Sequence, residues 1–251
     1  MALFDDPIAH RGLHDRARGI IENSLPAFEA AIAGGYGIEC DVQLSSDGVP
    51  FIFHDDEFDR LTAAKGRSDA RPIAEVQTLS LTDSIPPQVP PRFDEFLATV
   101  GGRTQLQIEL KQQQTVAATK RLAASVAEAL RAYSGPYTIE SFDPKLLFAV
   151  RRAGVTGGPL GIITYGYDEP AWDGSMPSST KFVLRHMLHW PWTRFDFISC
   201  RNVSLELPAV RLFRVLGTPV TAWTITSARD AEAALKHCDQ IVFEGFLPAS
   251  A

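Results

Sequence analysis

The chain has 251 residues, of which 45% are hydrophobic and 22% are charged, and its formal net charge is −6. This length allows one large core, and an α/β barrel commonly occupies it as a single domain, so we expect residues 1–251 to form one domain. The acidic balance argues against binding to nucleic acid or to an anionic membrane surface. No apolar run approaches the length of a membrane span, and the chain does not begin with the pattern of a signal peptide. Together with three isolated cysteines, these features favour a cytoplasmic protein without a stable membrane anchor.

Strand and helix patterns alternate along the chain. Strands are predicted at residues 7–10, 38–44, 105–110, 137–141, 160–164, 195–200, 220–225 and 240–243. Helices are predicted at about 24–33, 93–100, 115–132, 144–153, 179–189, 205–216 and 228–236. Eight strands that alternate with helices predict a (β/α)₈ TIM barrel. The segment after residue 243 is too short for a complete eighth outer helix.

One additional strand is predicted directly after the second barrel strand. Residues 49–54 follow residues 38–44 after a short turn that ends in Asp47-Gly48. A parallel connection needs a dozen or more residues, so the returning strand must run antiparallel as a short hairpin. The following residues, 55–95, are polar and rich in proline, with a short helix expected only at their end.

Two predicted barrel strands carry charged side chains on one face. Glu39 and Asp41 lie two residues apart, so their carboxylates point the same way and repel each other. Glu109 and Lys111 have the same relation on the next strand. A divalent cation with oxygen ligands would offset the repulsion of the acids. The alternatives are an exposed acidic pair at Glu39 and Asp41, and an internal ion pair between Glu109 and Lys111.

Histidines occur at the ends of two further strands, where a barrel places its chemistry. His10 precedes Arg11 at the end of the first strand, and His54 ends the hairpin. A single histidine there is more often structural, but the set as a whole matches phosphodiester cleavage. Arg11 and Lys111 would bind phosphate charge, and the histidines would act as general base and general acid. The cation, held by Glu39, Asp41 and Glu109, would polarise the phosphoryl oxygens.

The chain resembles the glycerophosphodiester phosphodiesterases, within the superfamily of phospholipase-C-like phosphodiesterases. The resemblance spans nearly the full length and is denser in the first half. It is carried by His10-Arg11-Gly12, Glu22-Asn23-Ser24, Glu39-Cys40-Asp41, Asp47-Gly48, His54-Asp55, Asp59-Arg60-Leu61-Thr62, Glu109-Leu110-Lys111, Ser141-Phe142-Asp143 and Ala222-Trp223-Thr224.

The resemblance implies a barrel that hydrolyses glycerophosphodiesters such as glycerophosphocholine to sn-glycerol 3-phosphate and an alcohol. The roles it implies are catalysis by His10 and His54, metal binding by Glu39, Asp41 and Glu109, and phosphate binding by Arg11 and Lys111. The family metal is Ca²⁺ or Mg²⁺. The resemblance also places Glu22 and Asn23 near the metal and the substrate, although helix capping is an equal alternative for Asn23.

Two departures from the family pattern leave the choice of substrate open. The last strand continues into Glu244-Gly245, where the family commonly has Thr-Asp followed by proline. The segment that ends near Pro91 is too short to be the large inserted domain of the periplasmic type.

Aromatic residues bear on the substrate as well. Trp223 could stack on a choline-like group or pack inside the barrel. Trp190 and Trp192, with Tyr165 and Tyr167, could form an apolar wall for a lipid-like substrate or the contact surface of a homodimer. Two alternatives to glycerophosphodiester hydrolysis therefore stay open, namely a lysophospholipase D and a non-catalytic barrel that binds phosphate esters.

Overall fold

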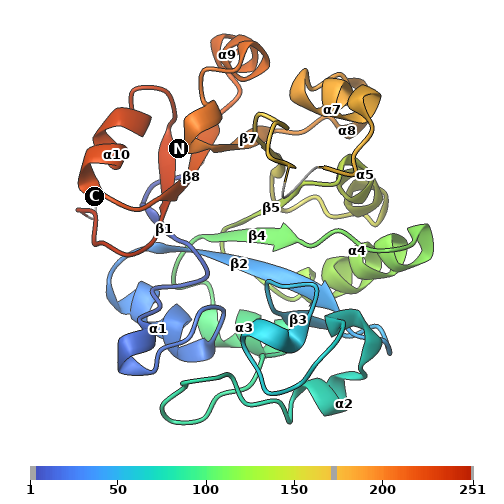
Figure 1. Ribbon diagram of the computed structural model, residues 1–251, viewed down its shortest axis with the longest axis vertical. Helices are drawn as coiled ribbons and strands as arrows, with labels where there is room; N and C mark the ends of the chain where they lie inside the picture. Colours follow the sequence, from blue (N-terminus) through green and yellow to red (C-terminus); the bar gives the residue numbers. More distant parts are fainter. Residues whose placement is uncertain (1–3, 171–173, 250–251) are drawn as a thin grey trace.

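The protein is a closed barrel with its helices outside (Figure 1). The computed structural model describes residues 4–170 and 174–249, so the ends of the predicted domain 1–251 lie outside the described residues. The ring closes because β1 (Ile8–Ala9) pairs in parallel with both β2 (Gly37–Leu44) and β9 (Gln240–Phe243). The other barrel strands are β4 (Leu106–Leu110), β5 (Tyr137–Ser141), β6 (Leu160–Thr164), β7 (Phe197–Arg201) and β8 (Val220–Ile225).

The strands alternate with helices, which confirms the predicted TIM barrel. The helices are α1 (Leu25–Ala33), α2 (Ile73–Val76), α3 (Phe93–Val100), α4 (Val116–Leu130), α5 (Pro144–Arg152), α7 (Ser178–Arg185), α8 (Trp190–Thr193), α9 (Pro208–Val215) and α10 (Ala228–Ala234). All strand pairs around the ring are parallel, so their carboxyl ends meet at one mouth of the barrel.

Local signals explain where the first helices begin and which face they bury. The Ser24 side chain accepts a hydrogen bond from the Ala27 amide at the start of α1, where a proline also occupies the first turn. Phe28 of α1 packs on Phe96 of α3, with 4.6 Å between the ring centroids. Both rings are fully buried, and burying one such side chain contributes about 1.5–3 kcal/mol.

The hairpin after β2 is present, and it carries a second small core. β3 (Pro50–Ile52) pairs antiparallel with β2, as predicted, with Val42 opposite Ile52. The segment 55–95 is predicted to be polar and rich in proline, but its scattered apolar side chains pack against the aromatic residues of β3 and its extension. This core contains Ile21, Phe51, Phe53, Phe58, Leu61, Ile73, Val76 and Leu81. It seats the short helix η2 (Phe58–Arg60) beside the barrel mouth.

Other differences are the unpredicted helix α2, the strand predicted at 195–200, which is found at Phe197–Arg201, and several helix ends. The helix expected at 179–189 ends at Arg185, and α8 follows it as a separate turn. The helix expected from residue 205 begins only at Pro208, because the 3₁₀ turn η4 (Asn202–Ser204) comes first. Within residues 4–170 and 174–249, no helix combines the length and apolarity that crossing a membrane requires.

Candidate active site

A cavity of about 1170 Å³ opens at the carboxyl ends of the barrel strands. Charged side chains line one side of the cavity, and aromatic and aliphatic side chains line the other. The residues from the sequence hypothesis that line it are His10, Arg11, Glu39, His54, Glu109, Lys111 and Trp223. The structure therefore brings together residues that are up to 213 positions apart, from His10 to Trp223.

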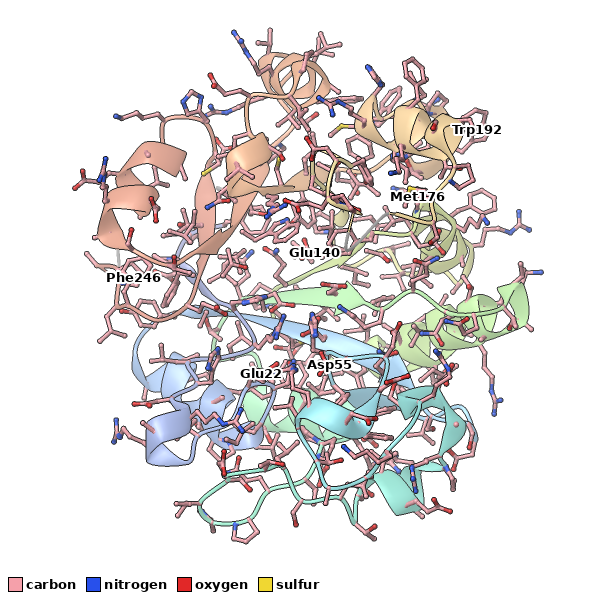
Figure 2. The ribbon with its side chains drawn as sticks, in the orientation of Figure 1. Glu22, Asp55, Glu140, Met176, Trp192 and Phe246 are labelled. Atoms are coloured by element: carbon pink, nitrogen blue, oxygen red, sulfur yellow. The ribbon has the colours of Figure 1, made fainter. Side chains whose placement is uncertain are left out.

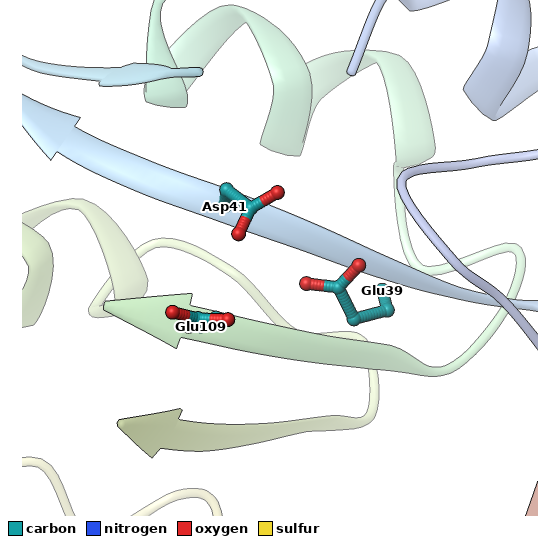
Figure 3. A group of neighbouring side chains, drawn as sticks. All are labelled: Glu39, Asp41 and Glu109. Carbon is teal, nitrogen blue, oxygen red and sulfur yellow. The ribbon is translucent and has the colours of Figure 1, made fainter. Parts of the chain in front are cut away.

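Three carboxylates meet at the floor of the charged side. Glu39 and Asp41 come from β2, and Glu109 comes from β4, where it is the register partner of Asp41 (Figure 3). One oxygen atom from each lies within 4.8 Å of the others. This separation follows from the alternation of side chains along β2 and from the parallel pairing with β4.

Burial and neighbouring charges shift the pKa values of the three carboxyl groups in different directions. Burial raises the pKa of Glu39 well above its usual range, and repulsion from Asp41 and Glu109 adds to the effect. Burial also raises the pKa of Glu109. Burial acts the same way on Asp41, but the charges of Lys111, His54 and Arg11 outweigh it and hold the Asp41 pKa well below its usual range.

Lys111 provides part of the missing positive charge. Its Nζ lies 2.8 Å from Glu109 Oε1 and 3.2 Å from Asp41 Oδ1, so the internal ion pair considered from the sequence is also present. Lys111 contacts Glu109 and Asp41 but not Glu39 in these ion pairs, and burial together with repulsion from Asp41 and Glu109 raises the pKa of Glu39. Three buried carboxylates with this surplus of negative charge fit a hard divalent cation, which prefers oxygen ligands.

His10 is held by a carboxylate from the opposite end of the chain. Its Nδ1 lies 2.7 Å from Glu244 Oε2. Hydrogen bonds from His10 and His14 keep the pKa of Glu244 well below its usual range, so this carboxylate is ionised and can only accept. His10 Nδ1 must therefore carry the proton, and Nε2, which lies 4.0 Å from Glu39 Oε2, faces the triad with a lone pair. Burial lowers the pKa of His10, which favours this neutral form.

His54 has the same arrangement with its neighbour in sequence. Its Nδ1 lies 2.6 Å from Asp55 Oδ1. Burial would raise the pKa of Asp55, but hydrogen bonds with His54 and Arg60 hold it well below its usual range. Asp55 therefore accepts a hydrogen bond from the Nδ1–H group of His54. The Nε2 atom of His54 then remains available to a ligand in the cavity.

Arg11 and the glycine after it both have left-handed backbone conformations. Its φ is 58°, and Gly12 follows at 79°. A Cβ at Gly12 would lie 2.8 Å from the Ala27 carbonyl carbon, so only glycine fits there. The turn directs the Arg11 amide to Glu39 Oε2 at 2.9 Å and its Nη1 to Glu22 Oε1 at 2.6 Å.

The two residues carried over from the resemblance both touch this network. Asn23 Nδ2 donates to Asp41 Oδ2 at 2.8 Å, whereas the cap of α1 is Ser24, so Asn23 does not serve as the helix cap. Glu22 binds Arg11 and also Arg60, whose Nη1 and Nη2 each lie 2.8 Å from a Glu22 oxygen. Neither Glu22 nor Asn23 is among the described residues that line the cavity.

The aromatic side of the cavity differs in part from the expected wall. Trp223 is half-buried, lines the cavity and meets Phe142 edge-on, with 5.6 Å between centroids. Tyr165 and Tyr167 also line it, with centroids 4.2 Å apart.

The two remaining tryptophans of the expected wall do not line the cavity. Trp190 packs on Phe213 of α9, and Trp192 lies at the outer edge of the molecule, with 68% of its surface exposed (Figure 2). They were assigned to a loop, whereas α8 turns them away from the mouth.

Sequence reasoning missed four residues of the site. Asp55 and Glu244 orient the histidines, and a carboxylate next to His54 or at the end of the last strand was a usable signal. Glu140 is the register partner of Glu109 on β5, which the period-two pattern of that strand could have shown. Arg60 belongs to Asp59-Arg60-Leu61-Thr62, which contributed to the resemblance but was given no role at the site.

The chain is similar in sequence to known glycerophosphodiester phosphodiesterases. Glycerophosphodiester phosphodiesterase 1 of Homo sapiens is 25% identical over 243 residues, which cover 88% of this chain and 71% of that protein. A glycerophosphodiester phosphodiesterase of Caldanaerobacter subterraneus is 43% identical over 60 residues, or 24% of each chain.

Solved structures share the fold at lower identity. A phosphodiesterase of Oleispira antarctica, in complex with the product sn-glycerol-3-phosphate, has a TM-score of 0.77 at 22% identity and covers 96% of this chain and 92% of its own. A glycerophosphoryl diester phosphodiesterase from Silicibacter pomeroyi has a TM-score of 0.73 at 24% identity, with 94% and 88% covered. The family model for glycerophosphoryl diester phosphodiesterases matches residues 10–238, and the chain belongs to that enzyme family.

Proposed function

We propose that this enzyme hydrolyses glycerophosphodiesters to sn-glycerol 3-phosphate and an alcohol, with a divalent cation and two histidines. One observation carries the proposal. Two histidines, each with its Nδ1 held by an ionised carboxylate, line the same cavity as Glu39 and Glu109 of the buried carboxylate triad. A phosphodiester needs charge neutralisation, deprotonation of the nucleophile and protonation of the leaving group, and these groups offer all three.

The charged residues divide the binding of the phosphate. Glu39, Asp41 and Glu109 would hold Ca²⁺ or Mg²⁺, which supplies Lewis-acid polarisation of the phosphoryl oxygens when bound. Arg11 and Lys111 line the cavity beside the triad and would bind the remaining phosphate charge. Glu22 and Asn23 would keep Arg11 and Asp41 in place.

The histidines would move the protons. Because both Nδ1 atoms donate to carboxylates, each Nε2 is available to the substrate. One, neutral at Nε2, takes the proton of the nucleophile, and the other, as an imidazolium with a proton on Nε2, protonates the leaving alkoxide, while Glu244 and Asp55 stabilise whichever imidazole is charged. The nucleophile is either water or the free hydroxyl of the glycerol, and the second route gives a cyclic phosphate that water must then open to sn-glycerol 3-phosphate. Product analysis in oxygen-18 water, with a search for the cyclic phosphate, separates the two routes.

The test is an assay on glycerophosphocholine with Ca²⁺, Mg²⁺ or Mn²⁺ and with a chelator. We expect activity that the chelator abolishes and that His10→Ala lowers by about 10²- to 10⁴-fold. His237→Ala, at an exposed histidine near α10, serves as the control and should keep wild-type activity. If the wild type is inactive with all three ions but still binds the diester, a non-catalytic phosphate-ester barrel is the better reading.

A second candidate, a lysophospholipase D, rests on the aliphatic side of the cavity. Helix α7 has no buried residue, yet its Val183 and Leu184 line the cavity with Met176 and the two tyrosines. An acyl chain of the substrate would cover this surface.

Comparing lysophosphatidylcholine with glycerophosphocholine tests this second candidate. Leu184→Asp should impair only the lysolipid reaction, and Leu212→Asp, at a residue of α9 that is 58% exposed, is the control. Activity on glycerophosphocholine with none on lysophosphatidylcholine would remove the candidate.

A further inference from the structure

Arg60 ends η2, on the segment of the second core, and its guanidinium grips two carboxylates at once. Its Nε and Nη2 donate to the two oxygens of Asp55 at 2.6 and 3.0 Å. Its Nη1 and Nη2 donate to the two oxygens of Glu22, both at 2.8 Å. Glu22 and Asp55 are thereby held together although they are 33 residues apart (Figure 2).

Each of these carboxylates holds a group that faces the phosphate site. Asp55 accepts from His54 Nδ1, and Glu22 accepts from Arg11 Nη1. The contacts therefore run without a break from one guanidinium to both His54 and Arg11. In the described part of the chain, this is the connection by which hydrogen bonds link the hairpin histidine to the arginine of the first strand.

The charges of the network are matched to this geometry. Burial would raise the pKa of Glu22, but hydrogen bonds and charge from Arg60 and Arg11 lower it to about 2. Two ionised carboxylates thus face two permanent cations. Charge-assisted bidentate bonds of this kind restrict orientation more than single contacts do.

We propose that Arg60 is a positioning residue that sets the orientation of His54 through Asp55 and of Arg11 through Glu22. This inference rests on the proposed function for its catalytic consequence, but its geometric content is independent of the substrate. An error of about 1 Å in the placement of such groups lowers rates by about 10²-fold.

The rival explanation is that Arg60 only fastens η2 and its segment to the barrel. Packing already does this, because Phe58 of the same turn is fully buried between Phe51 and Phe53. The side chain of Arg60 is 45% exposed, so water screens its ion pairs and reduces what they contribute to stability.

The first arm of the experiment compares kinetics with stability. We expect Arg60→Gln to lower kcat/KM by about 10- to 100-fold with little change in melting temperature, and Arg60→Lys to restore part of the loss. The matched control is Arg103→Gln. Arg103 is 46% exposed and holds both oxygens of Glu29, at 3.0 and 2.6 Å, away from the site. A loss in Arg60→Gln no larger than in Arg103→Gln would overturn the proposal.

The second arm is a pair of double-mutant cycles with Asp55→Asn and Glu22→Gln. If Arg60 acts through these carboxylates, each double variant should be little worse than the carboxylate variant alone. We expect the cycle with Asp55 to show its coupling in kcat, through His54, and the cycle with Glu22 in KM, through Arg11. Fully additive losses in both cycles would mean that Arg60 acts in another way.

The third arm does not need activity. In nitrogen-15 histidine spectra, the Nδ1 proton of His54 should be shifted downfield by its bond to Asp55, with assignment by His54→Asn. Arg60→Gln should weaken or broaden this signal, and Arg103→Gln should leave it in place. If the wild type proves inactive but the signal responds, the proposed function fails and the positioning role stands. An unchanged signal in Arg60→Gln overturns the positioning role even in an active enzyme.

Discussion

At the residue scale, the site depends on carboxylates outside the buried triad of Glu39, Asp41 and Glu109. Glu244 accepts from His10 Nδ1, and both its hydrogen bond and its charge raise the pKa of that histidine, in opposition to burial and to Arg11. Glu140 has no such partner for its Oε2 atom and lies next to Glu109 in the register of the barrel. Removing the charge of Glu244 should therefore impair catalysis, whereas removing the charge of Glu140 should stabilise the fold.

The first prediction concerns Glu244→Gln. The amide oxygen can still accept from His10, but the negative charge is lost, so the pKa of His10 should fall further. If His10 acts as the base, the acidic limb of kcat/KM must then move to lower pH, because the neutral imidazole persists there. We expect a loss of about tenfold in rate, smaller than for removal of the imidazole. The pH profile between 5 and 8 measures both effects, with the exposed Glu206→Gln as control. A limb that moves to higher pH would contradict the assignment of Glu244.

The second prediction concerns Glu140→Gln. Burial, together with the charge of Glu109, raises the pKa of Glu140 from 4.5 to about 8. The folded state therefore retains a proton that the unfolded chain releases, and stability falls as pH rises from 4.5 through about 8. Without added cation, the free energy of unfolding of Glu140→Gln at pH 8.5 should exceed that of the wild type by up to about 5 kcal/mol. The two proteins should have equal stability near pH 4.5. Urea unfolding at the two pH values measures the difference. A variant that is less stable at pH 8.5 would show that the charged form is the one accommodated.

At the element scale, the sequence predicted the barrel strands much better than the segment beside them. The strands at 137–141, 160–164, 220–225 and 240–243 have the predicted bounds, because barrel strands are buried on both faces and read as short apolar runs between turns. The second core was missed because its apolar residues are scattered and pack only once β3 has paired. The contact of Arg60 with Glu22 could not be predicted for the same reason, since Glu22 lies 38 residues before it.

The third prediction concerns the turn that carries His10 and Arg11. Gly12→Ala would place a Cβ 2.8 Å from the Ala27 carbonyl carbon at a φ of 79°. Gly217 has a similar φ of 91° with no atom within 4 Å of the added carbon, so Gly217→Ala measures the backbone strain alone. We expect about 1 kcal/mol of destabilisation at Gly217 and about 2 kcal/mol or more at Gly12, in chemical unfolding. Activity should fall only in Gly12→Ala, because that clash displaces Arg11. Equal destabilisation of the two variants would mean that α1 yields to the new side chain.

At the scale of the whole molecule, closing the barrel builds the site. Glu244 follows the last strand and His10 follows the first, so their hydrogen bond, which spans 234 positions, forms only when β9 pairs with β1. The convergence of His10, Glu39 and Glu109 could be predicted from sequence because parallel strands end at one edge. The pairing of Glu244 with His10 depends on that closure, whereas Asp55 adjoins its histidine, His54, in the sequence. The predicted homodimer stays a prediction, which sedimentation velocity would test.

The last prediction follows from the surplus of negative charge at the triad. A cation that binds only the folded chain raises its stability by about 2.7 kcal/mol at a concentration 100 times its dissociation constant. We expect Ca²⁺ or Mg²⁺ to raise the melting temperature at pH 7, and the rise to shrink as pH falls, because the raised pKa values of Glu39 and Glu109 make these ligands bind protons in competition with the ion. Asp41→Asn should abolish the ion-induced rise whatever its own stability, while the exposed Glu128→Gln on α4 should keep it. An ion-induced rise that survives Asp41→Asn in full would place the bound cation away from the triad.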